Sequence, residues 1–313
     1  MNIVHSISDF ISQKDCFVTI GTFDGVHIGH QKILKKLIQS AKEHKKESVL
    51  LTFFPHPRMV LQENVSIELL NTLKEKSALL EEMGLDSLII HPFSKEFSRL
   101  TALDFVRDIL VNQLNTSKLI IGYDHHFGKN REGNIDQLRE YSQLFDFDVE
   151  EIPAQDIDDV SVSSTKIRNA LHNGLLKTAN KYLGYQYMIN GTVVNGKKLG
   201  GKIGFPTANI DVKEDYKLIP KTGVYVVKAI LEDAGTCFGM MNIGYRPTLD
   251  GKHQTIEAHF FDYNGDLYGK SLKIELLYFL REEQKFNTVD DLIIQLKKDK
   301  ENSMFFLKNN LTL

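Results

Sequence analysis

The sequence predicts an α/β domain with a doubly wound parallel sheet, followed by a small antiparallel β-barrel that ends in a helix. Three observations carry this prediction. The chain has 313 residues, about twice the length of a typical domain. Its first half alternates short β-rich runs with helix-length amphipathic segments. Its second half strings short strands between glycine-rich turns. We place the boundary near Gly184, which gives domains of residues 1–184 and 185–313.

The first domain repeats a strand and helix order throughout. We expect strands at residues 16–21, 48–53, 87–93, 118–123 and 148–154. Helices are expected at residues 28–44, 71–83, 102–114, 135–145, 163–174 and 175–184. Such alternation predicts a parallel sheet with helices on both faces.

The second domain lacks this alternation. We expect strands at residues 187–194, 223–233, 236–244, 254–263 and 271–280. A final amphipathic helix is expected at residues 289–307, with an apolar stripe that packs against the barrel.

Composition excludes several classes of protein. The formal charge is −3, from 38 basic and 41 acidic residues, so we expect no nucleic-acid partner. Cys16 and Cys237 stand far apart and are expected to be free thiols rather than a disulfide or zinc ligands. The N-terminus has no apolar leader, and no apolar run reaches the roughly 18 residues of a membrane span. We therefore expect no membrane association and a cytoplasmic location.

A motif rich in glycine and histidine, Gly21-Thr-Phe-Asp-Gly-Val-His-Ile-Gly-His30, joins the first strand to the first long helix. Sheets of this kind bind ligands at the carboxyl ends of their strands, and helix N-termini favour phosphate. We expect Gly21, Gly25 and Gly29 to let the backbone approach a triphosphate closely.

Two histidines of this motif are candidate catalytic residues. His27 and His30 lie three residues apart across the first helical turn, so both imidazoles can reach one phosphoryl group. They would stabilise the negative charge of a transition state, without a protein nucleophile. A lone histidine in such a turn is more often structural, but the density of His, Gly and Asp here favours catalysis.

The motif G-x-F-D-G-V-H-x-G-H resembles the adenylyltransferase module of bacterial FAD synthetases, within the wider nucleotidyltransferase superfamily. Three further segments resemble that module: Phe54-Pro-His-Pro-Arg58, Gly122-Tyr-Asp-His-His-Phe-Gly128 and Ser163-Ser-Thr-Lys-Ile-Arg168. The resemblance implies that Arg168 supplies a fixed positive charge to the ATP phosphates. The ATP contacts that it implies are Gly21, Phe23, Asp24, Gly25, Gly29, Ser164 and Thr165. The flavin contacts that it implies are Phe54, His56, Pro57, Asp124 and Phe127.

The chain departs from this family at two positions. Thr22 stands where the family usually has Asn, and keeps a hydroxyl that can bond a phosphate or the backbone. His125 departs from the commoner Gly-Tyr-Asp-Phe pattern, and this bears on flavin packing.

A second motif, Gly200-Gly-Lys-Ile-Gly-Phe-Pro-Thr-Ala-Asn209, lies in the barrel half. Pro206 stiffens the chain, and the side-chain oxygens of Thr207 and Asn209 point to the same side of an extended segment. Two such oxygens suit Mg²⁺ held jointly with phosphates.

This second motif resembles the riboflavin kinase signature. In Thr255-Ile-Glu-Ala-His259, Glu257 matches the general base of that family. Strand alternation alone makes Glu257 a solvent-facing residue, which is the alternative. Residues 242–248, 265–269 and 280–286 complete the resemblance. The contacts that it implies are Lys202, Gly204, Phe205 and Tyr268 for the nucleotide, with Arg281 and Phe286 near the flavin; a core position is the alternative for Phe286.

Together the two resemblances imply a bifunctional riboflavin kinase and FAD synthetase. Its small-molecule partners would be riboflavin, FMN, FAD and ATP, with Mg²⁺ as the cofactor, in a monomer or weak homo-oligomer. An aminoacyl-tRNA synthetase, suggested by H-I-G-H at residues 27–30, is rejected because the chain has no K-M-S-K-S segment and no basic surplus. A flavin carrier without turnover is the remaining alternative, and retention of Glu257, both histidines and Arg168 weighs against it.

Overall fold

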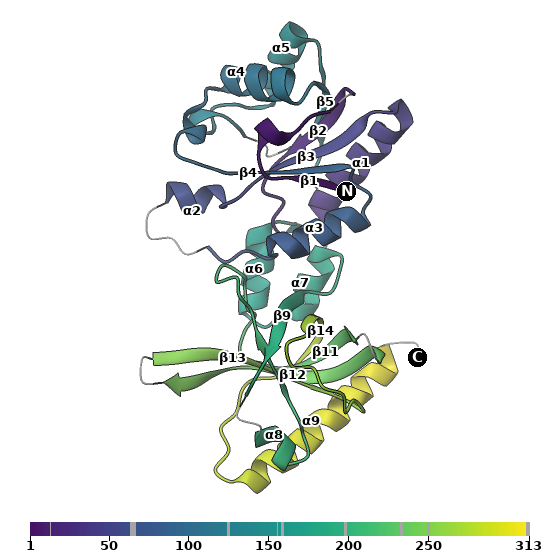
Figure 1. Cartoon of the computed structure of the whole chain (residues 1–313), viewed down its shortest axis with the longest axis vertical. Helices are drawn as coiled ribbons and strands as arrows, with labels where there is room; N and C mark the ends of the chain where they lie inside the picture. Colours follow the sequence, from purple (N-terminus) through teal and green to yellow (C-terminus); the bar gives the residue numbers. More distant parts are fainter. Residues whose placement is uncertain are drawn as a thin grey trace. The chain divides into compact units, whose positions relative to one another are not determined.

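The computed structural model describes residues 1–310 apart from 13, 63–66, 124–125, 155, 158–159, 197–198, 232–233 and 249–250. The chain divides into unit 1 (Met1–Ser164) and unit 2 (Thr165–Leu313) (Figure 1). The division falls earlier than the expected boundary near Gly184, because α7 (Leu176–Leu183) packs on β14 (Ser271–Arg281) of the barrel. The assignment of functional domains at Gly184 stays a prediction.

Unit 1 contains the expected parallel sheet. Every neighbouring pair of its six strands runs parallel. In sheet order the strands are β1 (Asn2–Val4), β4 (Ser87–His91), β3 (Glu47–Phe53), β2 (Cys16–Ile20), β5 (Thr116–Gly122) and β6 (Asp148–Ile152). The edge strand β1 was not anticipated, because its three residues are too short for a periodicity to appear. Figure 1 shows the sheet edge-on between its helices.

The direction of winding reverses in the middle of this sheet. From β2 the chain steps through β3 to β4 on one side, then returns to add β5 and β6 on the other. The reversal therefore lies between β2 and β5, whose following loops begin at Gly21 and Tyr123. Loops that diverge at such a switch point leave a crevice for ligands.

Helices cover both faces of the sheet, as the doubly wound prediction requires. One core contains Leu110 and Leu119 under the π-helix, and the other contains Leu34, Leu50 and Leu80 under α1 and α3. The helices are α1 (Ile28–His44), α2 (Pro57–Leu61), α3 (Leu73–Glu82), α4 (Ala102–Asp104), the π-helix η3 (Phe105–Gln113) and α5 (Ile135–Phe145). Three 3₁₀ turns, η1 (Ile7–Asp9), η2 (Phe97–Arg99) and η4 (Lys129–Arg131), and the hairpin β7 (Asp156–Ile157) and β8 (Val160–Ser161) complete the unit.

Unit 2 is a closed antiparallel barrel, as expected. Its six strands, in order around the barrel, are β10 (Ala208–Asp211), β13 (Gly251–Phe260), β12 (Gly235–Thr248), β11 (Gly223–Leu231), β14 and β9 (Met188–Val194). The unit also contains α6 (Ser164–His172), which begins at the last residue of unit 1, and α8 (Leu199–Lys202). The sequence did not predict β10, the strand that closes the barrel between β9 and β13.

The C-terminal helix α9 (Val289–Asn310) packs against the barrel through its apolar stripe. Leu307 is 3% exposed and lies in a cluster with Val224, Val226 and Met240 of the barrel strands. The expected packing of this helix is therefore confirmed.

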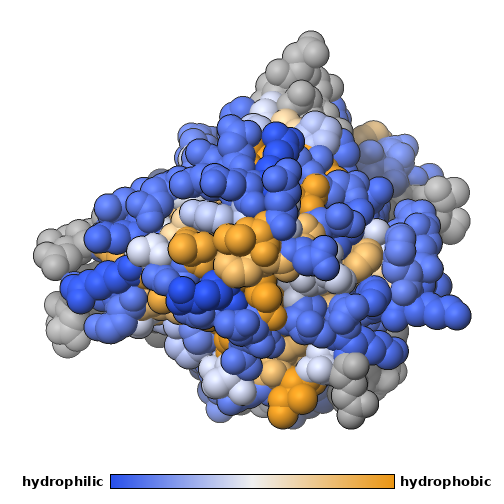
Figure 2. Space-filling view, turned by 90° about the horizontal axis from the view of Figure 1, so that it is seen from above, coloured by the Kyte–Doolittle hydropathy of each residue, from blue (hydrophilic) through white to orange (hydrophobic). Residues whose placement is uncertain are grey.

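Figure 2 shows one face on which charged and polar side chains surround a central group of apolar ones. Among the described residues, no helix combines the length and the apolar character needed to cross a bilayer. Both cysteines, Cys16 and Cys237, are free thiols and are buried.

Candidate active sites

The two histidines of unit 1 stack directly on each other. Their ring centroids are 3.6 Å apart and their planes differ by 16°. His27 caps α1, and its Nδ1 accepts a hydrogen bond of 3.4 Å from the backbone N–H of His30. Gly29 leaves room for this arrangement, since a Cβ there would lie 3.2 Å from two atoms of the His27 ring. The sequence motif therefore builds one compact imidazole pair at the switch point of the sheet.

Both imidazoles are held in the neutral form. Burial lowers the pKa of His27 from 6.5 to about 4. Burial also lowers the pKa of His30 well below its usual value, and positive charge on His27 and Lys76 adds to this. The His27 Nδ1 is an acceptor, so its Nε2 carries the proton and can donate. Within the described residues, the buried Nδ1 of His30 has no hydrogen-bond partner.

The turn before α1 has an unusual backbone. Phe23 and Val26 have φ angles of 45° and 36°, in the left-handed region that residues with a Cβ rarely adopt. Gly25, with a φ of 85°, adopts this region without such cost. Phe23 is 3% exposed, and its ring lies 4.7 Å from that of His30. Strained residues of this kind persist only where surrounding contacts fix them.

Asp24 helps to fix this turn. It is 2% exposed, and its Oδ1 accepts a 2.9 Å hydrogen bond from the backbone N–H of Leu70. The hydroxyl of Ser164 donates to the Asp24 carbonyl at 2.8 Å. These two expected ATP contacts therefore shape the turn through protein partners.

Lys76 is a residue of this site that the sequence did not single out. It lies on α3, is 5% exposed, and its Nζ donates a 2.6 Å hydrogen bond to the carbonyl of Thr22. The hydroxyl of Thr52 donates to the same carbonyl at 3.2 Å. Lysine side chains are rarely buried to this degree. The sequence alone does not show which lysine is buried.

The first of the expected flavin contacts follow β3. Phe54 packs against the core under α1 and α3. His56 caps α2, and its Nδ1 accepts a 3.2 Å hydrogen bond from the backbone N–H of Arg58. Pro57 begins the helix, where its lack of an N–H has no cost.

The remaining flavin contacts divide between the core and the undescribed part of the chain. Phe127 is 7% exposed and its ring lies 5.7 Å from that of Phe105, so it packs as a core aromatic. The predictions on Asp124 and His125 lie outside the described residues.

Thr165 and Arg168 lie on α6 within unit 2. The Gly21–His30 turn belongs to unit 1. The expected role of Arg168 at the ATP phosphates stays a prediction.

The second candidate site lies on the outer face of the barrel. Thr207 Oγ1 lies 3.4 Å from Glu257 Oε2 and donates to it. Asn209 on β10 stands directly opposite Glu257 on β13, so both side chains emerge on the same face. The neighbours of Glu257, Ile256 and Ala258, are 6% and 1% exposed and point into the barrel. The structure thus brings together the three residues expected to bind metal and accept a proton.

Two glycines make this arrangement possible. A Cβ at Gly196 would lie 2.0 Å from Asn209 Nδ2, and one at Gly200 would lie 2.2 Å from the Phe205 carbonyl oxygen. The N–H of Phe205 donates to the Gly200 carbonyl at 2.8 Å, so the motif folds back on itself. Only glycine permits such close approach of the backbone.

Asn242 and Glu283 also reach this region of the barrel. Asn242 on β12 faces Glu257 across the β12–β13 pair. A Cβ at Gly244 would lie 2.3 Å from Glu283 Oε1 and 3.0 Å from Asn242 Nδ2, so both side chains lie over that glycine. Both residues belong to segments that resemble the kinase family, but no pattern in those segments singled them out.

The other residues expected near the kinase nucleotide differ in exposure. Phe205 is 8% exposed and packs edge-on against His259, whose Nδ1 is 2.7 Å from the Pro206 carbonyl oxygen. Lys202 and Gly204 are exposed at and after the end of α8. Tyr268 is 42% exposed, and its N–H donates to Asp266 Oδ1 at 2.9 Å.

Arg281, expected near the flavin, contacts α9, and its expected role at the flavin stays a prediction. Its Nε and Nη2 make contacts of 2.7 to 3.1 Å with both carboxylate oxygens of Asp299, which is 1% exposed. Arg281 thereby joins the end of β14 to α9. Phe286 is half-buried in the segment between these two elements.

The oxygen donors of the barrel site fit a hard divalent cation. A hydroxyl, a side-chain amide and a carboxylate converge at Thr207, Asn209 and Glu257, and Mg²⁺ is bound in proteins by a few such oxygens together with substrate phosphates. In the part of the chain that the structure describes, no group of three His, Cys, Asp or Glu side chains could hold a metal by itself. A nucleotide would have to supply the remaining ligands.

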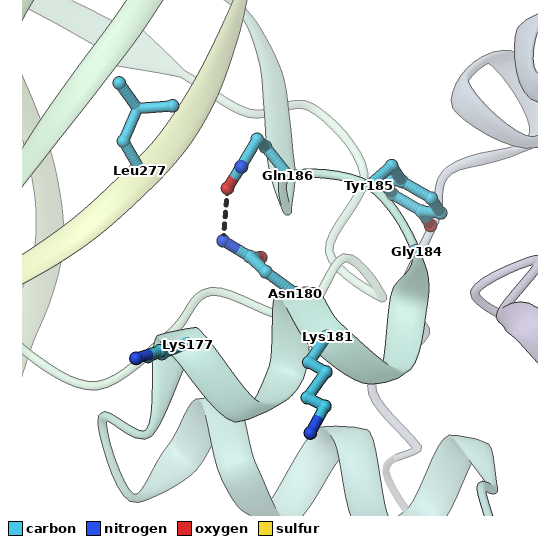
Figure 3. A pocket seen from close by; sticks show the side chains of 7 residues that line it. All are labelled: Lys177, Asn180, Lys181, Gly184, Tyr185, Gln186 and Leu277. Carbon is cyan, nitrogen blue, oxygen red and sulfur yellow. Dashed lines mark hydrogen bonds between the residues drawn. The ribbon is translucent and has the colours of Figure 1, made fainter. Parts of the chain in front are cut away.

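A surface hollow of about 360 Å³ lies elsewhere in unit 2, beside α7 (Figure 3). Lys177, Asn180 and Lys181 of the helix line it, and the Asn180 amide donates to Gln186 Oε1 across it. None of the predicted site residues lines this hollow, so it belongs to neither site.

A wound α/β unit with a glycine- and histidine-rich turn at its switch point, followed by a barrel that presents a carboxylate beside a hydroxyl and an amide, fits a nucleotide-dependent transferase with two sites. The family model for FAD synthetase matches residues 10–166, and that for riboflavin kinase matches residues 183–307. The chain belongs to the family of bifunctional riboflavin kinases/FMN adenylyltransferases.

Relatives match along almost the whole chain. The bifunctional riboflavin kinase/FMN adenylyltransferase of Listeria monocytogenes is 39% identical over 92% of this chain and 91% of its own length. That of Haemophilus influenzae is 39% identical over 95% and 96%. A crystal structure from Streptococcus pneumoniae, described as a macrolide-efflux protein, has a TM-score of 0.89 and 30% identity over 96% of this chain and 98% of its own. This chain is accordingly a bifunctional enzyme of FMN and FAD synthesis.

Proposed function

We propose that the barrel of unit 2 phosphorylates riboflavin and that the Gly21–His30 turn of unit 1 transfers AMP from a second ATP to FMN. The observation that supports this division is the separation of the two residue sets. Thr207, Asn209 and Glu257 lie together on the barrel, whereas the His27 and His30 stack lies at the switch point of the sheet.

In the kinase step, the 5′-hydroxyl of the ribityl chain attacks the γ-phosphorus of ATP, and ADP leaves. Glu257 accepts the hydroxyl proton as the new O–P bond forms. Thr207 and Asn209 would hold Mg²⁺, which neutralises phosphate charge when bound. The 3.4 Å contact between Thr207 and Glu257 supports this assignment, since it places the base beside the metal ligands.

In the adenylyl step, a phosphate oxygen of FMN attacks the α-phosphorus of ATP, and pyrophosphate leaves. The nucleophile arrives already ionised, so the site needs no base. The His27 Nε2–H and His30 would donate to the phosphoryl oxygens as their charge grows, and Arg168 would add a fixed positive charge. We place the enzyme in the cytoplasm, as a monomer or weak homo-oligomer.

A reciprocal pair of variants tests the division. Glu257→Gln should lower riboflavin phosphorylation by about 100-fold or more, which is typical for loss of a general base, and leave FAD formation from supplied FMN intact. His30→Ala should lower FAD formation by a similar factor and leave FMN formation intact. Chromatography of the flavins after incubation with ATP and Mg²⁺ measures both activities.

Two exposed positions provide the controls. Glu301→Gln on α9 and His5→Ala near the N-terminus make the same chemical changes on the surface, so neither should alter either activity. Loss of both activities in folded Glu257→Gln would contradict separate sites, and so would loss of FMN formation in folded His30→Ala. No product at all from the parent chain would favour a flavin carrier.

A further inference from the structure

Lys76 presents an unusual combination of charge and burial. Its side chain is 5% exposed, and burial lowers the pKa of its ammonium group. Of its three N–H donors, the hydrogen bond recorded among the described residues uses one, to the Thr22 carbonyl at 2.6 Å. A buried ammonium costs several kcal/mol unless its surroundings compensate it. A neutral donor could hold a carbonyl without this cost, so the charge itself calls for an explanation.

The backbone that Lys76 holds is the strained turn of the adenylyl site. Thr22 directly precedes Phe23, and Phe23 and Val26 both have positive φ angles. The Thr22 carbonyl accepts from Lys76 on α3 and from Thr52 at the end of β3. The conformation of the turn thus depends on contacts from two elements distant in sequence. The lysine contact is the shorter and the charged one.

The charge of Lys76 also reaches the catalytic imidazoles. Positive charge on Lys76 lowers the pKa of His30, and the carboxylate of Asp24 raises that of Lys76. In the described part of the chain, the titratable groups that face His30 are His27 and Lys76, and the one that faces Lys76 from the turn is Asp24. Lys76 therefore lies behind the phosphate-binding turn, near enough to act on its electrostatic potential.

We propose that Lys76 is a positioning residue for adenylyl transfer, which fixes the Gly21–Gly25 turn through the Thr22 carbonyl and adds positive charge beneath the phosphate site. It does not touch substrate. It orients the backbone amides that contact the phosphates, and its positive charge favours binding of the negatively charged ATP phosphates at the turn. This role rests on the assignment of FMN adenylyl transfer to unit 1 and extends it to α3.

The test replaces the charge and the hydrogen bond separately. Lys76→Met removes both and keeps an unbranched apolar side chain, Lys76→Arg keeps a cation, and Thr52→Val removes only the neutral hydrogen bond. Lys74→Met makes the first change at an exposed position of the same helix. Each variant is made in the full chain, and kcat/KM is measured for FAD formation from FMN and ATP from the lowest pH at which the parent stays folded up to pH 9, with FMN formation from riboflavin as the reference activity.

Lys76→Met should lower kcat/KM for adenylyl transfer about 10- to 100-fold, the equivalent of a hydrogen bond to a charged group. The acid limb of the pH profile of kcat/KM should move to higher pH in this variant, because removal of a positive charge raises the pKa of His30. Lys76→Arg should restore most of the activity and the parent limb. Thr52→Val should lose less than about fivefold, as a neutral hydrogen bond contributes less, and Lys74→Met should match the parent.

Three results would overturn the proposal. The first is a kcat/KM for adenylyl transfer in Lys76→Met within threefold of the parent value. The second is an equal loss of kcat/KM in Lys74→Met. The third is a loss in Lys76→Met with an unmoved acid limb and no restoration by Lys76→Arg, which would mean that Lys76 serves folding alone. Hydrogen exchange of α3 shows whether Lys76→Met folds. If it does not, the folded Lys76→Arg variant decides. An activity and an acid limb equal to those of the parent support the proposal, and a tenfold loss of activity refutes it. Loss of FMN formation together with FAD formation would instead contradict the assignment of separate sites.

Discussion

Removing one partner of the Arg281–Asp299 pair should destabilise unit 2 more than removing both. Asp299 is 1% exposed and Arg281 is 17% exposed. Arg281→Met would leave the buried carboxylate with Gln295, at 2.8 Å, as its remaining side-chain partner among the described residues. Breaking a buried ion pair in this way costs about 3–5 kcal/mol, because a desolvated charge is left without its counter-charge.

The double variant separates this cost from the net contribution of the pair. Arg281→Met with Asp299→Leu replaces two charges by apolar groups of similar size, and such replacements are close to neutral or stabilising. We expect it to recover most of the loss, measured by urea unfolding with hydrogen exchange of β14 and α9. Lys228→Met is the control, since its pair with Glu275 is more exposed, at 32% and 18%, and should cost under about 1 kcal/mol. A double variant no more stable than Arg281→Met would refute the reasoning.

The same variants decide between two roles for Arg281. If it joins β14 to α9, as its contacts indicate, the double variant should phosphorylate riboflavin with a KM within about threefold of the parent. A tenfold rise in KM at restored stability would mean that Arg281 binds the flavin, as the resemblance implied.

Two further predictions follow from burial and close packing. The pKa of His27 is about 4 in the folded chain against 6.5 for the free side chain, so below pH 6.5 the unfolded state binds the proton first. His27 should therefore contribute a fall of about 3 kcal/mol to the free energy of unfolding of unit 1 between pH 6.5 and 4; urea titrations of the parent and of His27→Asn over this range check it, and an equal slope in the two would contradict it. Gly196→Ala should reduce kinase activity at least about tenfold, because its Cβ would lie 2.0 Å from Asn209 Nδ2. Gly201→Ala, whose Cβ meets nothing within 4 Å, should keep both activities, and equal effects of the two changes in a flavin assay would exclude the steric cause.

The residues of the proposed adenylyl site could be predicted from the sequence far better than the residues that hold them in place. Residues 21–30 are contiguous, so strand end, turn and helix start place His27 and His30 together by local geometry alone. Lys76 is 54 positions from Thr22 along the chain, and only the packing of α3 under the turn brings the two together. Periodicity reports which face of a helix is buried, but it does not report which backbone carbonyl that face meets.

The barrel site, too, could be predicted only in part from the sequence. The sequence suggested Thr207 and Asn209 as a pair and Glu257 only by resemblance, because a single acid on a strand is usually solvated. What joins them is β10, whose four residues are too few for an alternation pattern to appear. Once β10 pairs with β13, the register sets Asn209 against Glu257. The contact of Arg281 with Asp299 could not be predicted for a related reason, since Asp299 lies on another element.

The two proposed sites differ in the way that the reactions proposed for them require. A ribityl hydroxyl must lose a proton before it becomes a good nucleophile, and the barrel presents a carboxylate, Glu257, beside oxygens suited to a cation. The phosphate of FMN is already an anion, so a carboxylate facing it would repel it. In the turn of unit 1, the one carboxylate, Asp24, is turned onto the Leu70 N–H and away from water, and buried neutral imidazoles line the turn above Lys76. A base for one nucleophile would thus obstruct the other, which gives a physical reason for keeping the two reactions in separate units.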